Sequence, residues 1–209
     1  MSAAGDFRTY LAECPLVAII RGVTPAEAEA IAGAICEAGI RIIEVPLNSP
    51  HPLKSISSIA DALGEDALVG AGTVLTVDDV EKVKQAGGRL VVSPNMNPEV
   101  IGATVAAGMV SCPGIFTPTE AFTALRAGAT VIKLFPAEAA SPKAVRAMRA
   151  ILPTDTTLLI VGGITPESMK PWLDAGANGF GLGGGLYKPG QSPEETLAKA
   201  RTYVQALKA

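Results

Sequence analysis

The chain has 209 residues, of which 48% are hydrophobic and 18% are charged, and its formal net charge is −3. This composition excludes a disordered or coiled-coil protein, and the absence of clustered Lys, Arg and aromatic residues argues against nucleic-acid binding. Three Cys and one His, His51, provide neither a disulfide framework nor a His-based metal site. We therefore expect a cytoplasmic protein, and the lack of a leader or a long apolar run argues against a membrane partner.

The N-terminal segment 2–13 has the pattern of a short helix, which we expect to cover the bottom of the fold. Short β-branched runs then alternate with longer helical patterns. The predicted strands are 16–21, 41–46, 67–70, 90–93, 109–112, 130–134, 158–161 and 179–182. The predicted helix 25–38 has clear ends, because Thr24 can cap it, Pro25 suits its first turn and Gly39 can end it.

Eight strands, each followed by a helix, predict an α/β fold. Because no linker rich in Ser, Gly or charge divides the chain, we expect a single domain over residues 1–209, a closed (β/α)8 barrel with a short N-terminal helix. An open doubly wound sheet is the alternative, since strand counting does not prove closure. The first predicted strand lacks the GxGxxG turn of a dinucleotide-binding sheet, which argues against that alternative.

Lys133 is the most informative residue, because it lies in the apolar run ATVIKLFP with no acidic neighbour in the sequence. Burying an ammonium group is costly, so a lysine in such a strand tends to shed its proton. A neutral amine is a nucleophile, which makes Lys133 a candidate for covalent catalysis. The alternative is that only the stem is buried, while the head reaches solvent or pairs with a distant carboxylate.

Polar residues also mark the ends of the first three strands, where barrel enzymes carry their chemistry. Arg21 ends the first strand, and Thr73 follows the third in the motif GAGT. Glu44 nearly ends the second strand, and period-two alternation places it on the same face as Ile42 and Ile40. Each of these residues alone could be a solvent-exposed residue at the rim of the barrel. Their placement together at one end of the barrel favours a functional site.

Glycines follow the last two strands, as Gly162-Gly163 and Gly183-Gly184-Gly185. They need no function as turn residues, but in barrels of this kind the loops after strands seven and eight form the usual phosphate site.

Together these groups describe a reaction. Lys133 would form a Schiff base with a carbonyl, and Glu44 would move protons. Arg21 and Thr73 can hold a carboxylate, while the glycine loops hold a phosphate. We therefore predict carbon–carbon bond cleavage or formation in a phosphorylated 2-keto acid.

Eight segments spread in order along nearly the whole chain resemble the class I aldolases for 2-keto-3-deoxy-6-phospho sugar acids. They are IIRG (19–22), IIEVPLNSP (42–50), GAGTVL (70–75), SPN (93–95), CPG (112–114), TEAFTALRAGA (119–129), IKLFPA (132–137) and VGGI (161–164). The resemblance implies a (β/α)8 barrel, usually a homotrimer. It also implies cleavage of the substrate into pyruvate and glyceraldehyde 3-phosphate without a metal or other cofactor.

By this resemblance, Lys133 is the Schiff-base lysine and Glu44 is an acid/base that works through a water. Arg21 and Thr73 match the contacts to the substrate carboxylate, and Phe135 matches a ring beside the Schiff base. For Phe135 the alternative is ordinary core packing. The residues that match the phosphate loops are Gly162, Gly163, Gly183 and Gly184.

Two positions resemble the galactonate branch of this family. Asn48 and Val161 stand where the gluconate branch tends to have Arg and Thr, so the implied substrate is 2-dehydro-3-deoxy-6-phosphogalactonate. The strand-eight loop often carries a Ser, which is missing around Gly184, so phosphate binding would depend more on backbone donors. The alternatives are an aldolase for the gluconate epimer or for 4-hydroxy-2-oxoglutarate. The two remaining alternatives are a non-aldolase phosphate-binding barrel and a non-catalytic sugar-phosphate binding protein.

Overall fold

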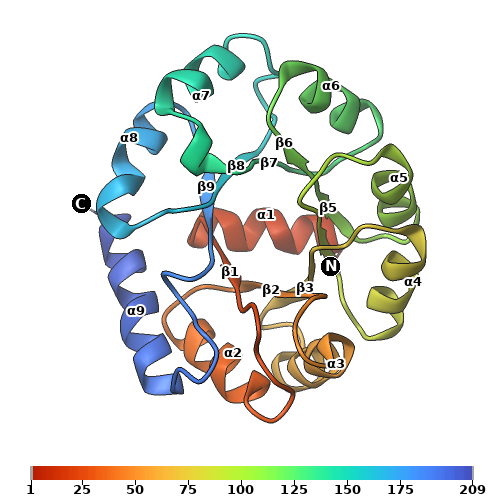
Figure 1. The fold of residues 1–209 in the computed structure, drawn as a ribbon, viewed down its shortest axis with the longest axis vertical. Coiled ribbons are helices and arrows are strands. Elements are labelled where there is room, and N and C mark those ends of the chain that lie inside the picture. Colours follow the sequence, from red (N-terminus) through yellow and green to blue (C-terminus); the bar gives the residue numbers. More distant parts are fainter. Residues whose placement is uncertain (1, 209) are drawn as a thin grey trace.

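The computed structural model describes residues 2–208, and its strands form one parallel sheet in the order β5-β4-β3-β2-β1-β9-β8-β7-β6. Figure 1 shows these strands as a ring with helices around it. The strands are β1 (Leu16–Ile19), β2 (Ile42–Pro46), β3 (Leu68–Gly72), β4 (Leu90–Val92), β5 (Val110–Cys112), β6 (Gly114–Ile115), β7 (Ile132–Leu134), β8 (Leu158–Val161) and β9 (Gly179–Leu182). Each predicted strand is present, with ends that differ from the prediction by at most two residues.

The two ends of the sheet order, β5 and β6, are separated in the chain by Pro113 alone. Proline has no N–H to donate, so the ladder is interrupted there. The Pro113 carbonyl still accepts a hydrogen bond from the Lys133 N–H at 3.0 Å. The strands β5 and β6 therefore occupy one position of the barrel, and the ring closes with eight positions. The predicted (β/α)8 barrel is confirmed.

The outer helices follow the strands. They are α2 (Ala28–Glu37), α3 (Pro52–Leu63), α4 (Val77–Gln85), α5 (Pro98–Ala106), α6 (Pro118–Arg126), α7 (Pro142–Arg149), α8 (Met169–Asp174) and α9 (Pro193–Ala206), with short 3-10 turns η1 (Ala137–Ala139) and η2 (Pro166–Ser168). Within residues 2–208, no helix combines the length and the apolar composition that a membrane crossing needs.

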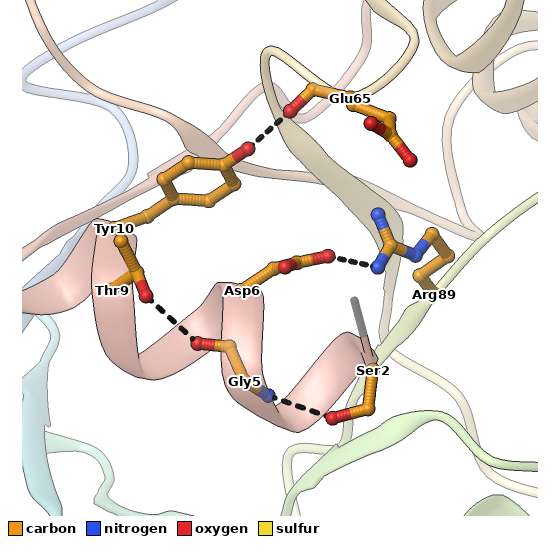
Figure 2. Close-up of polar contacts among 7 residues, drawn as sticks. All are labelled: Ser2, Gly5, Asp6, Thr9, Tyr10, Glu65 and Arg89. Carbon is orange, nitrogen blue, oxygen red and sulfur yellow. Dashed lines mark hydrogen bonds and ion pairs between the residues drawn. The ribbon is translucent and has the colours of Figure 1, made fainter.

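The predicted N-terminal helix is present as α1 (Ala3–Glu13), with the Ser2 side chain accepting a hydrogen bond from the Gly5 N–H. It lies across the centre of the ring (Figure 1). As Figure 2 shows, Asp6 pairs with Arg89, next to the start of β4, and the Tyr10 hydroxyl donates to the Glu65 carbonyl shortly before β3. The helix therefore covers the amino-terminal end of the barrel, opposite the strand ends that carry the predicted site.

Alternation along the strands separates two apolar clusters. Ile42 packs inside the ring with Phe7 of α1, whereas Ile43 packs between the sheet and the outer helices. Glu44 follows Ile42 into the interior, as predicted. Ile40 does not: it belongs to the outer cluster, because it precedes β2 and its N–H is bonded to the Ile35 carbonyl at the end of α2. The period-two rule fails for Ile40 because this residue is not yet in the strand.

Candidate active site

A cavity of about 450 Å³ opens at the carboxyl ends of the strands, and nearly all the predicted site residues line it. They are Arg21, Glu44, Thr73, Lys133, Phe135, Val161, Gly162, Gly163, Gly183 and Gly184. Asn48 is the exception, since it is not among the lining residues. The residues come from six different strands or the loops after them, so the closed barrel is what brings them together.

Lys133 is the middle residue of β7 and pairs with Gly114 on one side and Leu159 on the other. Only 6% of the residue is exposed, so the head is buried with the stem. Burial lowers the pKa of Lys133, and Arg21 adds to this effect, while Cys112 and Glu44 act in the opposite direction.

No ion pair involves Lys133 within residues 2–208, and its Nζ lies 5.1 Å from the centroid of the Phe135 ring. An ammonium group over a ring face is stabilised only modestly, so the ring offsets part of the burial cost. The arrangement therefore presents an amine with increased neutral character to the cavity.

Glu44 lies in β2 and is 3% exposed. Its Oε2 accepts no hydrogen bond within the described part of the chain. Burial raises the pKa of Glu44 to about 7, although Lys133 and Arg21 both lower it. A carboxyl group with this pKa exists in both forms at neutral pH, which is what proton transfer in both directions requires.

Gly72 explains how a carboxyl group fits at this point of a packed barrel. A Cβ at position 72 would lie 1.8 Å from the Glu44 Oε2, so only glycine leaves room for the carboxyl group. The next residue, Thr73, has a φ of +58°, a left-handed conformation that β-branched residues rarely adopt. Strained residues of this kind concentrate at functional sites, where the surrounding structure holds them.

Arg21 and Asn48 form one unit at the rim of the cavity. Both are exposed, and the Arg21 Nη1 donates a hydrogen bond to the Asn48 Oδ1. Asn48 thus orients the guanidinium group from outside the cavity. This leaves the other guanidinium donors of Arg21 free to face an anion.

The glycine loops after β8 and β9 form the other side of the cavity. Gly162 and Gly163 have φ values of +114° and +62°, which favour glycine. A Cβ at Gly183 or Gly184 would meet nothing within 4 Å, so these two positions face open space.

Tyr203 of α9 connects these two loops. Its hydroxyl donates a 2.9 Å hydrogen bond to the Ile164 carbonyl after β8. A Cβ at Gly185 would lie 2.2 Å from the same hydroxyl oxygen. Glycine at position 185 therefore lets Tyr203 pack beneath the loop after β9 while it holds the loop after β8.

The structure adds lining residues that the sequence did not predict. Among those in the described part of the chain, only Glu138 has a charged side chain. Glu138 lies in η1, five residues after Lys133, and its carboxylate packs over Gly162 and Gly163. Its place on the loop directly after the lysine strand was the available signal. Within residues 2–208, no group of three or more His, Cys, Asp or Glu side chains is arranged to hold a metal ion.

Comparison with known proteins gives consistent results. The family model for KDPG and KHG aldolase matches residues 8–198. The chain is 49% identical to 2-dehydro-3-deoxy-6-phosphogalactonate aldolase of Escherichia coli (strain K12), over 93% of this chain and 95% of the relative. It is 34% identical to 2-dehydro-3-deoxy-phosphogluconate aldolase of Treponema pallidum (strain Nichols), over 79% and 78%. A solved structure described as native KDPGal matches with a TM-score of 0.92 and 48% identity, over 94% of this chain and 95% of that one.

Proposed function

Since the chain belongs to the KDPG and KHG aldolase family, we propose that it cleaves 2-dehydro-3-deoxy-6-phosphogalactonate to pyruvate and D-glyceraldehyde 3-phosphate through a Schiff base on Lys133. The observation that carries the proposal is the pairing of two buried groups in one cavity. Lys133 has a lowered pKa, and Glu44 has a pKa of about 7. Two relatives at 49% and 46% identity bear the name of this galactonate enzyme, the second as probable, which supports the choice of substrate.

The proposed chemistry uses only these two groups and water. The Lys133 amine attacks the C2 carbonyl, and loss of water gives an iminium that accepts the electron pair of the C3–C4 bond as it breaks. Glu44 takes the C4 hydroxyl proton through a water, so the aldehyde leaves. The carboxyl group then returns a proton to C3 of the enamine, and hydrolysis of the iminium releases pyruvate.

The remaining residues would bind the two charged ends of the substrate. Arg21, oriented by Asn48, and Thr73 would hold the pyruvyl carboxylate, with the Phe135 ring beside the Schiff base. The phosphate would lie among backbone N–H groups of the loops after β8 and β9. Among the residues that the structure describes, no Lys or Arg side chain lines that half of the cavity, so the backbone is the available source of donors.

The test of this function is cleavage of the two C4-epimeric substrates side by side, with 4-hydroxy-2-oxoglutarate as a third. We expect the galactonate epimer to be preferred. If the gluconate epimer is cleaved at least as well, the proposed substrate is wrong, whereas membership of the aldolase family stands. That membership already argues against a non-aldolase barrel and against a non-catalytic binding protein.

Val161→Thr is expected to shift the epimer preference. Val161 lies on the same strand face as Leu159, the partner of Lys133, and one step nearer the cavity mouth. A hydroxyl at this place could bond one orientation of the C4 hydroxyl, and one such bond contributes about 0.5–1.5 kcal/mol, or roughly a few-fold to tenfold. The kcat/KM ratio should move toward the gluconate epimer, while pyruvate trapping at Lys133 is unchanged. An unaltered ratio would remove Val161 from the specificity argument.

Gly183→Val is expected to weaken phosphate binding without disturbing the fold. Gly183 does not have a positive φ, and a Cβ there points into open space, so the new side chain would occupy the cavity instead of clashing with protein. We expect KM for the phosphorylated substrate to rise by roughly 10–100-fold, the cost of lost bonds to a charged group.

The matched control is Gly102→Val, at an equally open position in α5. Pyruvate trapping should be normal in both variants. An equal loss of trapping and cleavage in Gly183→Val would indicate misfolding. Gly163 is the poorer choice for this test, because its φ is +62° and a Cβ there would lie 2.8 Å from the Glu138 Cγ.

Two further properties are proposed. The family resemblance supports a homotrimer, which sedimentation equilibrium measures directly. The cysteine usage, with no disulfide framework, supports action in the cytoplasm.

A further inference from the structure

We infer that Glu138 is a specificity-determining residue that accepts a hydrogen bond from the C5 hydroxyl of the substrate. This inference rests on the proposed function. Five polar side chains of residues 2–208 line the cavity. Arg21, Glu44 and Thr73 belong to the first three strands or the loops after them, and Lys133 would hold the C2 carbon. Glu138 is the fifth.

The position of Glu138 is defined by the glycine pair beneath it. A Cβ at Gly162 would lie 2.1 Å from the Glu138 Oε2, and one at Gly163 would lie 2.8 Å from its Cγ. Both glycines also have positive φ values. The Glu138 side chain therefore fills the space where side chains at Gly162 and Gly163 would point, and its carboxylate lies against one of the two loops proposed to bind the phosphate.

The carboxylate of Glu138 has no partner of its own. Within residues 2–208 it takes part in none of the side-chain hydrogen bonds or ion pairs, and the residue is exposed to the cavity mouth. Structural carboxylates in this chain behave differently: Glu27, for example, accepts bonds from both the Thr24 N–H and the Tyr187 hydroxyl. An unpaired acceptor in the cavity is thus available to a ligand donor.

The substrate offers a matching donor at the matching place. With C2 on Lys133 and the phosphate on C6 in the glycine loops, the C5 hydroxyl lies next to the phosphate end. Glu44 is already used at C4. A carboxylate repels a phosphate dianion, so a carboxylate beside the phosphate loop favours binding only if it accepts a hydrogen bond from the substrate.

The experiment compares two aldehydes in the reverse reaction, the addition of pyruvate. D-glyceraldehyde 3-phosphate carries the hydroxyl that becomes the C5 hydroxyl, whereas 3-oxopropyl phosphate has the same length and phosphate but lacks it. The wild type should prefer the hydroxylated aldehyde. In Glu138→Ala this preference should fall by roughly 10–100-fold, the effect of one charge-assisted hydrogen bond, through loss on the hydroxylated aldehyde alone. In Glu138→Gln the preference should fall less, because glutamine keeps a neutral acceptor oxygen.

The matched control is Glu167→Gln, because Glu167 lies on the same β8 loop region but does not line the cavity. It should leave the preference unchanged. An unaltered preference in Glu138→Ala would overturn the inference, and so would equal gains with both aldehydes, which would show that Glu138 only repels phosphate. Pyruvate trapping in each variant reports an intact site. If the wild type adds pyruvate to neither aldehyde, the result contradicts the proposed aldolase function itself, and the inference that rests on it is then also wrong.

Discussion

Replacing Lys133 with either Ala or Arg is expected to lower kcat/KM for cleavage by roughly 10⁴–10⁶-fold, the range for removing a covalent nucleophile. Alanine has no amine to form the iminium that accepts electrons from the C3–C4 bond. Arginine restores a cation at the same place, but a guanidinium group stays protonated and is not a nucleophile at neutral pH. If Lys133 acted only as a charge, Lys133→Arg would retain much of the activity that Lys133→Ala loses.

The covalent step is measured by adding borohydride in the presence of pyruvate, followed by mass spectrometry of peptides. A single reduced pyruvyl group should appear on the peptide that contains Lys133, and in neither variant. The matched control is Lys143→Ala, since Lys143 is exposed at the start of α7 and should leave labelling and turnover unchanged. Labelling of a different lysine in the wild type would contradict the assignment.

The pH dependence of trapping gives a second measure. Burial lowers the pKa of Lys133, so more of the amine is neutral at pH 7 than for an exposed lysine. The trapping rate should therefore stay high at neutral pH and fall as the pH decreases through that lowered pKa. For a lysine with an ordinary pKa, the trapping rate would increase only in strongly alkaline solution.

Most of the barrel was predictable because its strands carry a strong local signal. Each strand of a closed parallel barrel is buried on both faces and reads as a short β-branched run. The second part of the fifth strand was missed. Gly114–Ile115 comes after Pro113, and a proline in a run normally ends the strand. Only the closure of the ring, a property of the whole sheet, pairs β6 with β7.

The start of α2 shows a different limit. Thr24 and Pro25 predict a helix from residue 25, but α2 begins at Ala28, and no side chain in the described structure caps it. The Glu27 carboxylate bonds back to the Thr24 N–H and also accepts a hydrogen bond from the Tyr187 hydroxyl, 160 residues away. A contact between residues so far apart in the sequence therefore holds residues 25–27 in a turn, although the local sequence favours a helix there.

The site was predictable where strand ends determined it, and not where side chains on neighbouring loops meet. Lys133 and Glu44 follow from burial and alternation along single strands. The bond between Arg21 and Asn48 depends on how the loops after β1 and β2 approach each other. The place of Glu138 depends in the same way on the packing of η1 against the loop after β8. Neither leaves a periodic signal in the sequence.

Glu44→Gln is expected to reduce cleavage by roughly 10²–10⁴-fold, the usual contribution of a positioned acid/base. Glutamine keeps the shape that Gly72 accommodates but cannot take the C4 hydroxyl proton. Pyruvate trapping on Lys133 should persist. In the wild type, kcat/KM should rise as the pH increases through about 7, because the carboxylate is the form that accepts the proton. The variant should lack this dependence, and near-normal turnover would contradict the role.

The stability of the same variant tests the cause of the raised pKa independently of catalysis. Glu44 has a pKa of about 7 in the folded chain against an ordinary value of 4.5, so between these pH values the native state binds more protons than the unfolded state. The free energy of unfolding of the wild type should therefore fall as the pH rises from about 4.5 to about 7, and this contribution should then be constant. A shift of this size corresponds to on the order of 3 kcal/mol.

Denaturant unfolding at pH 5 and pH 8 should show most of that loss of stability in the wild type and not in Glu44→Gln. The control is Glu99→Gln, which should behave as the wild type because Glu99 is exposed in the first turn of α5. An equal pH dependence in all three proteins would mean that burial does not hold the Glu44 carboxyl group protonated, and the acid/base role would then lack its physical basis.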